Sequence, residues 1–173
     1  FVYGVITPRL IEEITKIAKK HNLLLFGDLQ CSSQVGNITK FKNFDLICPT
    51  EREARISLSN KDDSIEKISN DILKLTNSKN LIMKLGANGF ITYSNQTKKF
   101  VDREHFPSLT INPIDVTGAG DSLLAGTSLS LACGADIMTA SVIGASMASI
   151  CIQSVGNFSI SKKYEYLDNI FLR

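Results

Sequence analysis

Ile114-Asp115-Val116-Thr117-Gly118-Ala119-Gly120-Asp121-Ser122 is the stretch of sequence that decides the fold. Two glycines flank an alanine, so the backbone can turn tightly and stays open to a ligand. Small and apolar side chains then recur at helical spacing, which predicts a helix that begins at the glycines. The N–H groups in the first turn of a helix have no intrahelical partner and favour an anion. The stretch therefore predicts an anion site, for which phosphate is the usual ligand.

Asp121 is an unusual residue at such a site, because its carboxylate repels an anion unless it has a chemical role. One interpretation is that Asp121 is a general base, which takes a proton from a hydroxyl as the hydroxyl attacks phosphorus. The other is that Asp121 is a first-turn acid or a cap that only stabilises the helix. Spacing alone does not choose between them, since a short glycine motif is weak evidence.

The composition is that of an ordinary globular protein, with 43% hydrophobic and 21% charged residues among 173. We expect one α/β domain over residues 1–173. The net charge of +2 gives no electrostatic case for binding nucleic acid or a membrane surface. No apolar run reaches the ~18 residues of a membrane span, and no signal peptide is visible. Four scattered cysteines without metal-type pairing are typical of reduced thiols in a cytoplasmic protein.

Local patterns predict alternating strands and helices. Thr7-Pro8 begins a helix that runs to about Lys20, and the apolar run Leu23–Phe26 is typical of a buried strand. Strand, helix and strand in this order predict a parallel sheet. The other expected elements are a strand end near Val5, strands at 44–49, 80–84, 90–93 and 98–101, helices from Thr50 and at 61–77, 119–133, 137–154 and 164–171, turns at 85–89 and 95–96, and irregular chain up to Asn112.

Two further polar groups follow expected strands. Asp28 and Gln30 come after the strand that ends at Phe26, where open parallel sheets bind ligands, so they either face an active site or form a polar surface turn. Thr50 and Glu53 have the spacing of a capping box, which explains both residues structurally.

Asp115-Val116-Thr117-Gly118-Ala119-Gly120-Asp121 resembles the C-terminal signature of the ribokinase (PfkB-type) carbohydrate kinases. That signature is Asp-Thr-x-Gly-Ala-Gly-Asp, and Val116 stands in place of its usual Thr. The resemblance implies that Asp121 is the catalytic base, and that the N–H groups of Gly118, Ala119, Gly120 and Asp121 stabilise the transferred phosphoryl group. It also implies ATP and Mg²⁺ as cofactors, and a three-layer α/β/α fold whose sheet is mostly parallel with antiparallel edge strands.

The resemblance extends to other expected cofactor contacts. Where the family has Pro-Asn-x-x-Glu, this chain has Glu53 at the acid that helps to place magnesium and phosphates, while Thr50 replaces the Asn. Lys84, Gly86 and Gly89 match the family's x-Leu-Gly-x-x-Gly turn against the nucleotide, although a plain hairpin would look the same. Family members border the adenine with a loop like that around Gly156, which together with the Asp115–Thr117 segment makes a monovalent-cation site for K⁺. Gln30 departs from the family's usual Asp-x-Asn.

Family members are about twice as long, so the N-terminal half of the fold, with most sugar contacts, is expected to be missing here. We therefore expect a fragment of a longer kinase or a truncated gene product, and expect this chain alone to be inactive. The segments 27–34 and 49–55 most resemble the branch acting on bacterial heptose phosphates. The expected partner is a small-molecule sugar. A kinase of a nucleoside or vitamin alcohol, an inactive nucleotide-binding fragment and a homodimer of the complete protein are left open.

Overall fold

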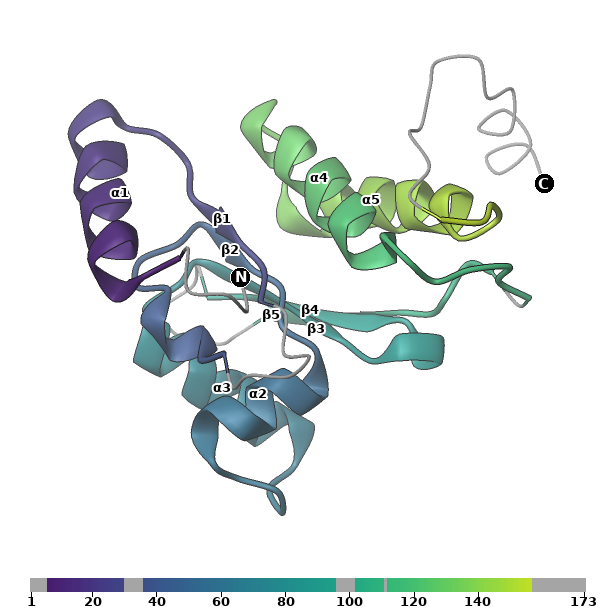
Figure 1. Ribbon diagram of the computed structural model, residues 1–173, viewed down its shortest axis with the longest axis horizontal. Helices are drawn as coiled ribbons and strands as arrows, with labels where there is room; N and C mark the ends of the chain where they lie inside the picture. Colours follow the sequence, from purple (N-terminus) through teal and green to yellow (C-terminus); the bar gives the residue numbers. More distant parts are fainter. Residues whose placement is uncertain (1–5, 30–35, 96–101, 111, 157–173) are drawn as a thin grey trace. The chain divides into compact units, whose positions relative to one another are not determined.

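The computed structural model describes residues 6–29, 36–95, 102–110 and 112–156. The chain divides into two compact units, Phe1–Pro107 with the sheet and Ser108–Arg173 with two packed helices (Figure 1). The strand end near Val5, the edge strand at 98–101 and the terminal helix at 164–171 lie outside the described residues, as does Gln30.

The first unit contains a five-stranded mixed sheet in which the strands follow one another in chain order. Its first three strands, β1 to β3, pair in parallel, and the last two pairings are antiparallel. The antiparallel strands at one edge are therefore confirmed, while the described sheet is mixed rather than mostly parallel. The strands are β1 (Phe26–Gly27), β2 (Leu46–Ile47), β3 (Asn80–Lys84), β4 (Phe90–Ser94) and β5 (Asp102–Phe106).

The first parallel strand is shorter than the apolar run predicts. Leu23 and Leu24 are 59% and 43% exposed, and only Phe26 of the run belongs to β1. The cause is the preceding helix, which ends at Asn22 in the left-handed conformation, and the Leu23 N–H bonds back to the Ala18 carbonyl. Leu23 therefore completes the end of a helix.

β5 is also a departure from expectation, because irregular chain was expected between Val101 and Asn112. The strand consists almost entirely of exposed polar side chains, so it has no apolar periodicity to reveal it. Five residue pairs with β4 hold it in place, and Phe106 stacks on Phe90 with ring centroids 5.1 Å apart.

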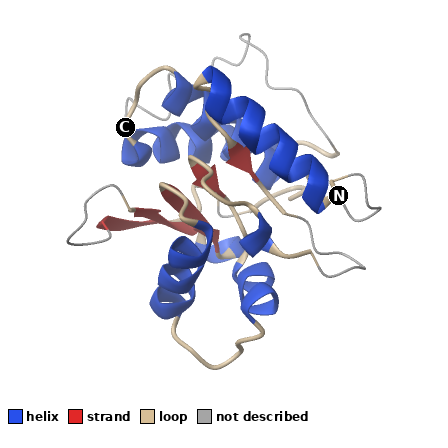
Figure 2. Cartoon of the chain, turned by 90° about the vertical axis from the view of Figure 1, so that its left-hand side faces the viewer, coloured by secondary structure: helices blue, strands red, loops and turns tan. Residues whose placement is uncertain are grey.

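Each α-helix of the first unit begins after a side-chain cap, and the caps of α1 and α2 are those that the sequence predicts. Thr7 caps α1 (Pro8–His21) by accepting a hydrogen bond from the Leu10 N–H. Thr50 caps α2 (Glu51–Leu58), and Ser64 caps α3 (Ile65–Thr76), so α3 begins later than expected. The described part also contains two short 3-10 helices, η1 (Ile38–Lys40) and η2 (Gly86–Asn88). Figures 1 and 2 show α2 and α3 side by side on one face of the sheet.

Strand alternation determines which side chains enter the core. Side chains such as Ile47, Leu81 and Met83 face α2 and α3 and pack against Ile68 and Ile72. Residues two apart in a strand share a face. Lys84 therefore lies on the face opposite Leu81 and Met83. Asp28 and Cys48 directly follow β1 and β2, and in the parallel register they lie on the same face of the sheet as Lys84.

The second unit is a pair of closely packed helices, α4 (Ala119–Ala132) and α5 (Ile137–Cys151). A Cβ added to Gly144 would lie 2.2 Å from Thr127 Oγ1, and one added to Gly126 would lie 2.6 Å from Met147 Sδ. The glycines at these two positions therefore allow the two helices to pack closely. α5 ends at Cys151, three residues before the expected end at Ser154. Over the described ranges, the structure has no helix with the length and apolarity needed to cross a membrane.

Candidate active site

The glycine loop begins α4 as the sequence predicts. Gly118 is the N-cap and has a φ of 78°, a conformation in which a side chain would be strained. The Ser122 N–H donates to the Gly118 carbonyl at 2.9 Å, and the Ala119 N–H donates to Val116 at 3.2 Å. Within the described residues, the N–H groups of Gly118, Gly120 and Asp121 have no acceptor. Three of the four N–H groups that were expected to bind an anion are therefore available, whereas the Ala119 N–H already donates to the Val116 carbonyl.

Asp121 is the third residue of α4, and its side chain is exposed. A cap would accept a hydrogen bond from a first-turn N–H, but α4 has no side-chain capping bond. Across the described part of the chain, no hydrogen bond or ion pair engages this carboxylate. Asp121 can therefore act on a ligand beside the loop, although its negative charge also favours the first turn of a helix.

Asp115 joins the signature loop to the loop after α5. Its Oδ1 accepts from the Thr117 N–H at 2.9 Å, and its Oδ2 accepts from the Gly156 N–H at 2.9 Å. The pKa of Asp115 is lowered, first by the Thr117 hydroxyl and then by the Thr117 and Gly156 N–H groups. The Ile114 N–H also donates to the Ile152 carbonyl at 2.8 Å. The structure thus brings together Asp115, Thr117 and Gly156, the residues expected around a monovalent cation.

Glu53 lies in the first unit, at the start of α2, and completes the expected capping box. Its Oε2 accepts from the Thr50 N–H at 2.7 Å, while its own N–H donates to Thr50 Oγ1 at 3.2 Å. The Lys84 N–H bonds to the Pro49 carbonyl at 2.9 Å, so the end of β3 lies beside this helix start. The capping box fixes a buried carboxylate at the carboxyl ends of the parallel strands, where open α/β sheets bind ligands.

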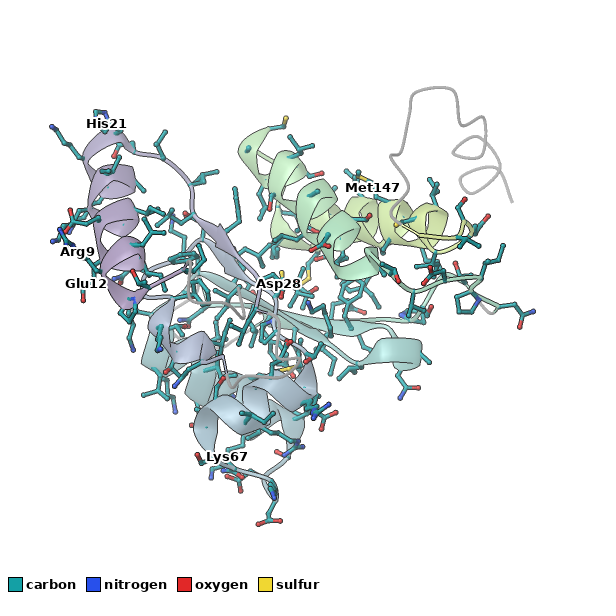
Figure 3. All side chains as sticks on the ribbon, in the orientation of Figure 1. Arg9, Glu12, His21, Asp28, Lys67 and Met147 are labelled. Carbon is teal, nitrogen blue, oxygen red and sulfur yellow. The ribbon has the colours of Figure 1, made fainter. Side chains whose placement is uncertain are left out.

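Asp28 and Lys84 form an ion pair at the same edge of the sheet. Lys84 Nζ lies 2.6 Å from Asp28 Oδ2, and the two side chains are 16% and 18% exposed. Asp28 Oδ1 accepts from the Leu29 N–H at 2.7 Å. Asp28 therefore belongs to a half-enclosed charged cluster at the sheet edge, and its part in an active site stays a prediction. Figure 3 shows Asp28 where the ribbon of β1 ends.

The electrostatic effects at this edge link Asp28, Cys48, Glu53 and Lys84. Burial raises the pKa of Asp28, the charge of Lys84 opposes this shift, and the charge of Glu53 adds to it. Burial likewise raises the pKa of the Cys48 thiol, so Cys48 is a neutral, fully buried neighbour of the pair. Sequence reasoning considered Asp28 and Lys84 separately. The signal that could have paired them is their shared position at the carboxyl ends of expected strands.

Gly86 and Gly89 form the turn between β3 and β4. Their φ angles are 61° and 81°, and the Leu85 N–H donates to the Gly89 carbonyl at 2.8 Å. These backbone conformations favour glycine at both positions whether or not a ligand binds. Their contact with a nucleotide therefore stays a prediction.

The described elements have the arrangement found in solved structures of the ribokinase-like fold. The Thermotoga maritima ribokinase is similar, with a TM-score of 0.68, 25% identity, and 85% of this chain and 48% of that chain covered. Arabidopsis thaliana ribokinase, solved with ribose and ATP, has a TM-score of 0.73, 21% identity, and coverage of 88% and 48%. Escherichia coli phosphofructokinase-2, solved with potassium, has a TM-score of 0.72, 16% identity, and coverage of 87% and 48%. The similarities to the Arabidopsis and Escherichia coli structures show a shared fold and nothing further.

Residues 1–163 match the pfkB family carbohydrate kinase model, and the chain belongs to this family. The bifunctional protein HldE of Desulfatibacillum aliphaticivorans is 29% identical over 162 residues, covering 92% of this chain and 32% of that protein. HldE of Campylobacter jejuni strain 81116 is 27% identical over 164 residues, covering 93% and 33%. The chain thus spans about a third of the length of these curated relatives and about half of the solved chains.

Proposed function

We propose that the protein carrying this chain is an ATP-dependent carbohydrate kinase that phosphorylates a hydroxyl of a sugar or sugar phosphate. The observation that carries the proposal is the start of α4. There an exposed carboxylate without a described partner, that of Asp121, stands in the same turn as three N–H groups without acceptors. A base beside an anion site is the combination that phosphoryl transfer to a hydroxyl requires.

In the proposed reaction, Asp121 takes the proton of the attacking hydroxyl. The N–H groups of Gly118, Gly120 and Asp121 donate to oxygens of the transferred phosphoryl group, and their fixed orientation stabilises the charge that develops on it. The dipole of α4 adds a partial positive charge at the same place. The hydroxyl oxygen bonds to phosphorus as the bond to the ADP oxygen breaks, so ADP leaves with the electron pair.

The residues present fit Mg²⁺ and ATP as cofactors. The described residues contain no group of three or more His, Cys, Asp or Glu side chains that could hold a metal. Magnesium bound with ATP needs only one or two carboxylates besides phosphate and water, and Glu53 supplies a buried carboxylate at the sheet edge. Magnesium would neutralise charge on the phosphates. Lys84, Gly86, Gly89 and Gly156 are the proposed nucleotide contacts.

Two finer proposals concern the acceptor and a monovalent cation. The similarity to HldE supports a heptose phosphate as the acceptor. The hydrogen-bonded loops of Asp115, Thr117 and Gly156 support a K⁺ site that orders the anion loop.

The test is ADP release from Mg·ATP by the purified complete protein, with four acceptors: a heptose phosphate, ribose, a nucleoside and a vitamin alcohol. We expect the heptose phosphate to give the highest kcat/KM. The highest kcat/KM with the nucleoside or the vitamin alcohol would contradict a carbohydrate kinase. ATP binding without turnover on any acceptor would favour an inactive nucleotide-binding protein.

A further inference from the structure

The ion pair of Asp28 and Lys84 is more enclosed than another pair attached to the same strand. Lys79, beside the start of β3, holds Asp45 Oδ1 at 2.7 Å with its own side chain 63% exposed. Lys84, at the other end of β3, is only 16% exposed. Removing charges from water costs free energy that their attraction often fails to return. The enclosed pair therefore calls for an explanation beyond stability.

Strand pairing does not need this ion pair. The Cys48 N–H donates to the Gly27 carbonyl at 3.0 Å, and the Lys84 N–H donates to the Pro49 carbonyl at 2.9 Å. These backbone bonds already join the ends of β1, β2 and β3. The ion pair passes over β2, linking residues that are 56 positions apart in sequence.

The Asp28 carboxylate is itself oriented, which lets it fix the position of the ammonium. Its Oδ1 is held by the Leu29 N–H at 2.7 Å, and this leaves Oδ2 directed at Lys84 Nζ. A lysine ammonium has three N–H donors. The bond to Asp28 uses one of them and restricts the long side chain to one region of the sheet edge.

The charges at this edge make Lys84 valuable to a phosphate ligand. The negative charge of Glu53 acts on Asp28, so two carboxylates and one ammonium share the edge. An incoming phosphate would meet net negative charge there without Lys84. A positioned ammonium offsets that repulsion and donates charge-assisted hydrogen bonds to phosphate oxygens.

We propose that Asp28 is a positioning residue for Lys84, which it holds at the carboxyl edge of the sheet so that the ammonium contacts a phosphate oxygen of ATP. This inference rests on the proposed kinase function and deepens it. It assigns Asp28 a role that acts through another side chain, and it assigns Lys84 to the phosphates rather than to the base or sugar of the nucleotide.

The test compares four variants of the complete protein: Lys84→Met, Asp28→Asn, Asp28→Glu and Lys79→Met. Each is measured for kcat, for the KM of ATP and of the acceptor, for Mg·ATP binding by calorimetry, and for Tm. We expect Lys84→Met to raise the KM of ATP about tenfold or more, since it removes a charged hydrogen bond. Asp28→Asn should also raise the KM of ATP and weaken Mg·ATP binding, and Asp28→Glu should restore most of the loss. Lys79→Met, the matched control, should leave both ATP constants unchanged.

A structural role predicts a different outcome. If Asp28→Asn lowers Tm but leaves the KM and Kd of ATP unchanged, Asp28 does not position Lys84 for ATP. A rise in the KM of the acceptor alone would overturn the assignment to ATP. If Asp28→Asn does not fold, the Kd of Mg·ATP for Lys84→Met decides, and a wild-type value refutes the inference.

The same measurements separate this inference from the proposed function. ATP binding that depends on Asp28 and Lys84, in a protein that phosphorylates no acceptor, would refute the kinase and support the inference. Turnover with an ATP KM independent of both residues would support the kinase and refute the inference. A protein that binds no ATP would refute both.

Discussion

Glu53 has a structural role in the capping box and a proposed role in placing magnesium, and one substitution separates them. In the structure, the Thr50 N–H donates to Glu53 Oε2 at 2.7 Å, and Glu53→Gln keeps an oxygen that can accept this hydrogen bond. Gln serves in capping boxes as Glu does, so the free energy of unfolding should change by only about 0.5 kcal/mol or less. Thr50→Ala removes the oxygen that accepts the Glu53 N–H at 3.2 Å. Loss of such a cap costs about 1 kcal/mol, which corresponds to a fall in Tm of about 2–4 °C in a chain of this size.

Thermal unfolding and a magnesium titration of kcat, both measured on variants of the complete protein, form the assay. Glu53→Gln should keep a Tm near that of the wild type, while the Mg²⁺ concentration for half-maximal activity rises about tenfold or more. Thr50→Ala should do the opposite, with a lower Tm and an unchanged magnesium requirement. If both variants lose similar stability and neither changes the magnesium requirement, Glu53 is a capping residue only and its proposed role is refuted.

Three further predictions follow from the second unit. Gly144→Ala should lower the free energy of unfolding in urea by about 1–3 kcal/mol, because its Cβ would lie 2.2 Å from Thr127 Oγ1 and 2.7 Å from the Leu123 carbonyl oxygen. The control Ala125→Ser, on the exposed side of α4, should leave the urea midpoint of unfolding unchanged. An unchanged midpoint for Gly144→Ala as well would contradict the close packing of α4 and α5. Asp136 caps α5 and has its pKa lowered from 3.8, first by the Thr139 hydroxyl, so its stabilisation is present above that pH and is lost as the pH falls through the folded-state pKa. Asp136→Ala should therefore lower Tm more at pH 7 than at about pH 2, and an equal loss at both would exclude a charged cap. K⁺ should raise the kcat of the complete enzyme above the kcat measured in tetramethylammonium at matched ionic strength, and Asp115→Asn should remove this difference. Equal kcat values for the wild type in the two salts would exclude the cation site.

The parts of the fold that sequence predicts well are those with a local signal. Thr7-Pro8 and the Thr50–Glu53 box mark where α1 and α2 begin, and the bounds of β3 agree with the expected strand at 80–84. The errors have physical causes that are not local. Leu23 is apolar but completes the end of a helix, while the polar residues of β5 form a strand only because β4 pairs with them.

The candidate site shows the same division. The loop from Gly118 to Asp121 was predictable because glycine, helix start and acid lie within a few residues of one another. The engagement of the Ala119 N–H by Val116 was missed, since it depends on the shape of one turn. The pairing of Asp28 with Lys84 was missed because it depends on β2 lying between β1 and β3, an order that neither residue's neighbours encode.

The most direct test of the proposed mechanism is the kcat of Asp121→Asn in the complete enzyme, measured beside the Kd of ATP by calorimetry. Asn keeps the size of Asp at the start of α4, so the fold should survive, but Asn cannot accept the hydroxyl proton. We expect kcat to fall by about 10²–10⁴-fold, the usual contribution of a general base. The Kd of ATP should stay the same or decrease, because a negative charge near the phosphates is removed. A change in kcat of less than about threefold would contradict general-base catalysis by Asp121.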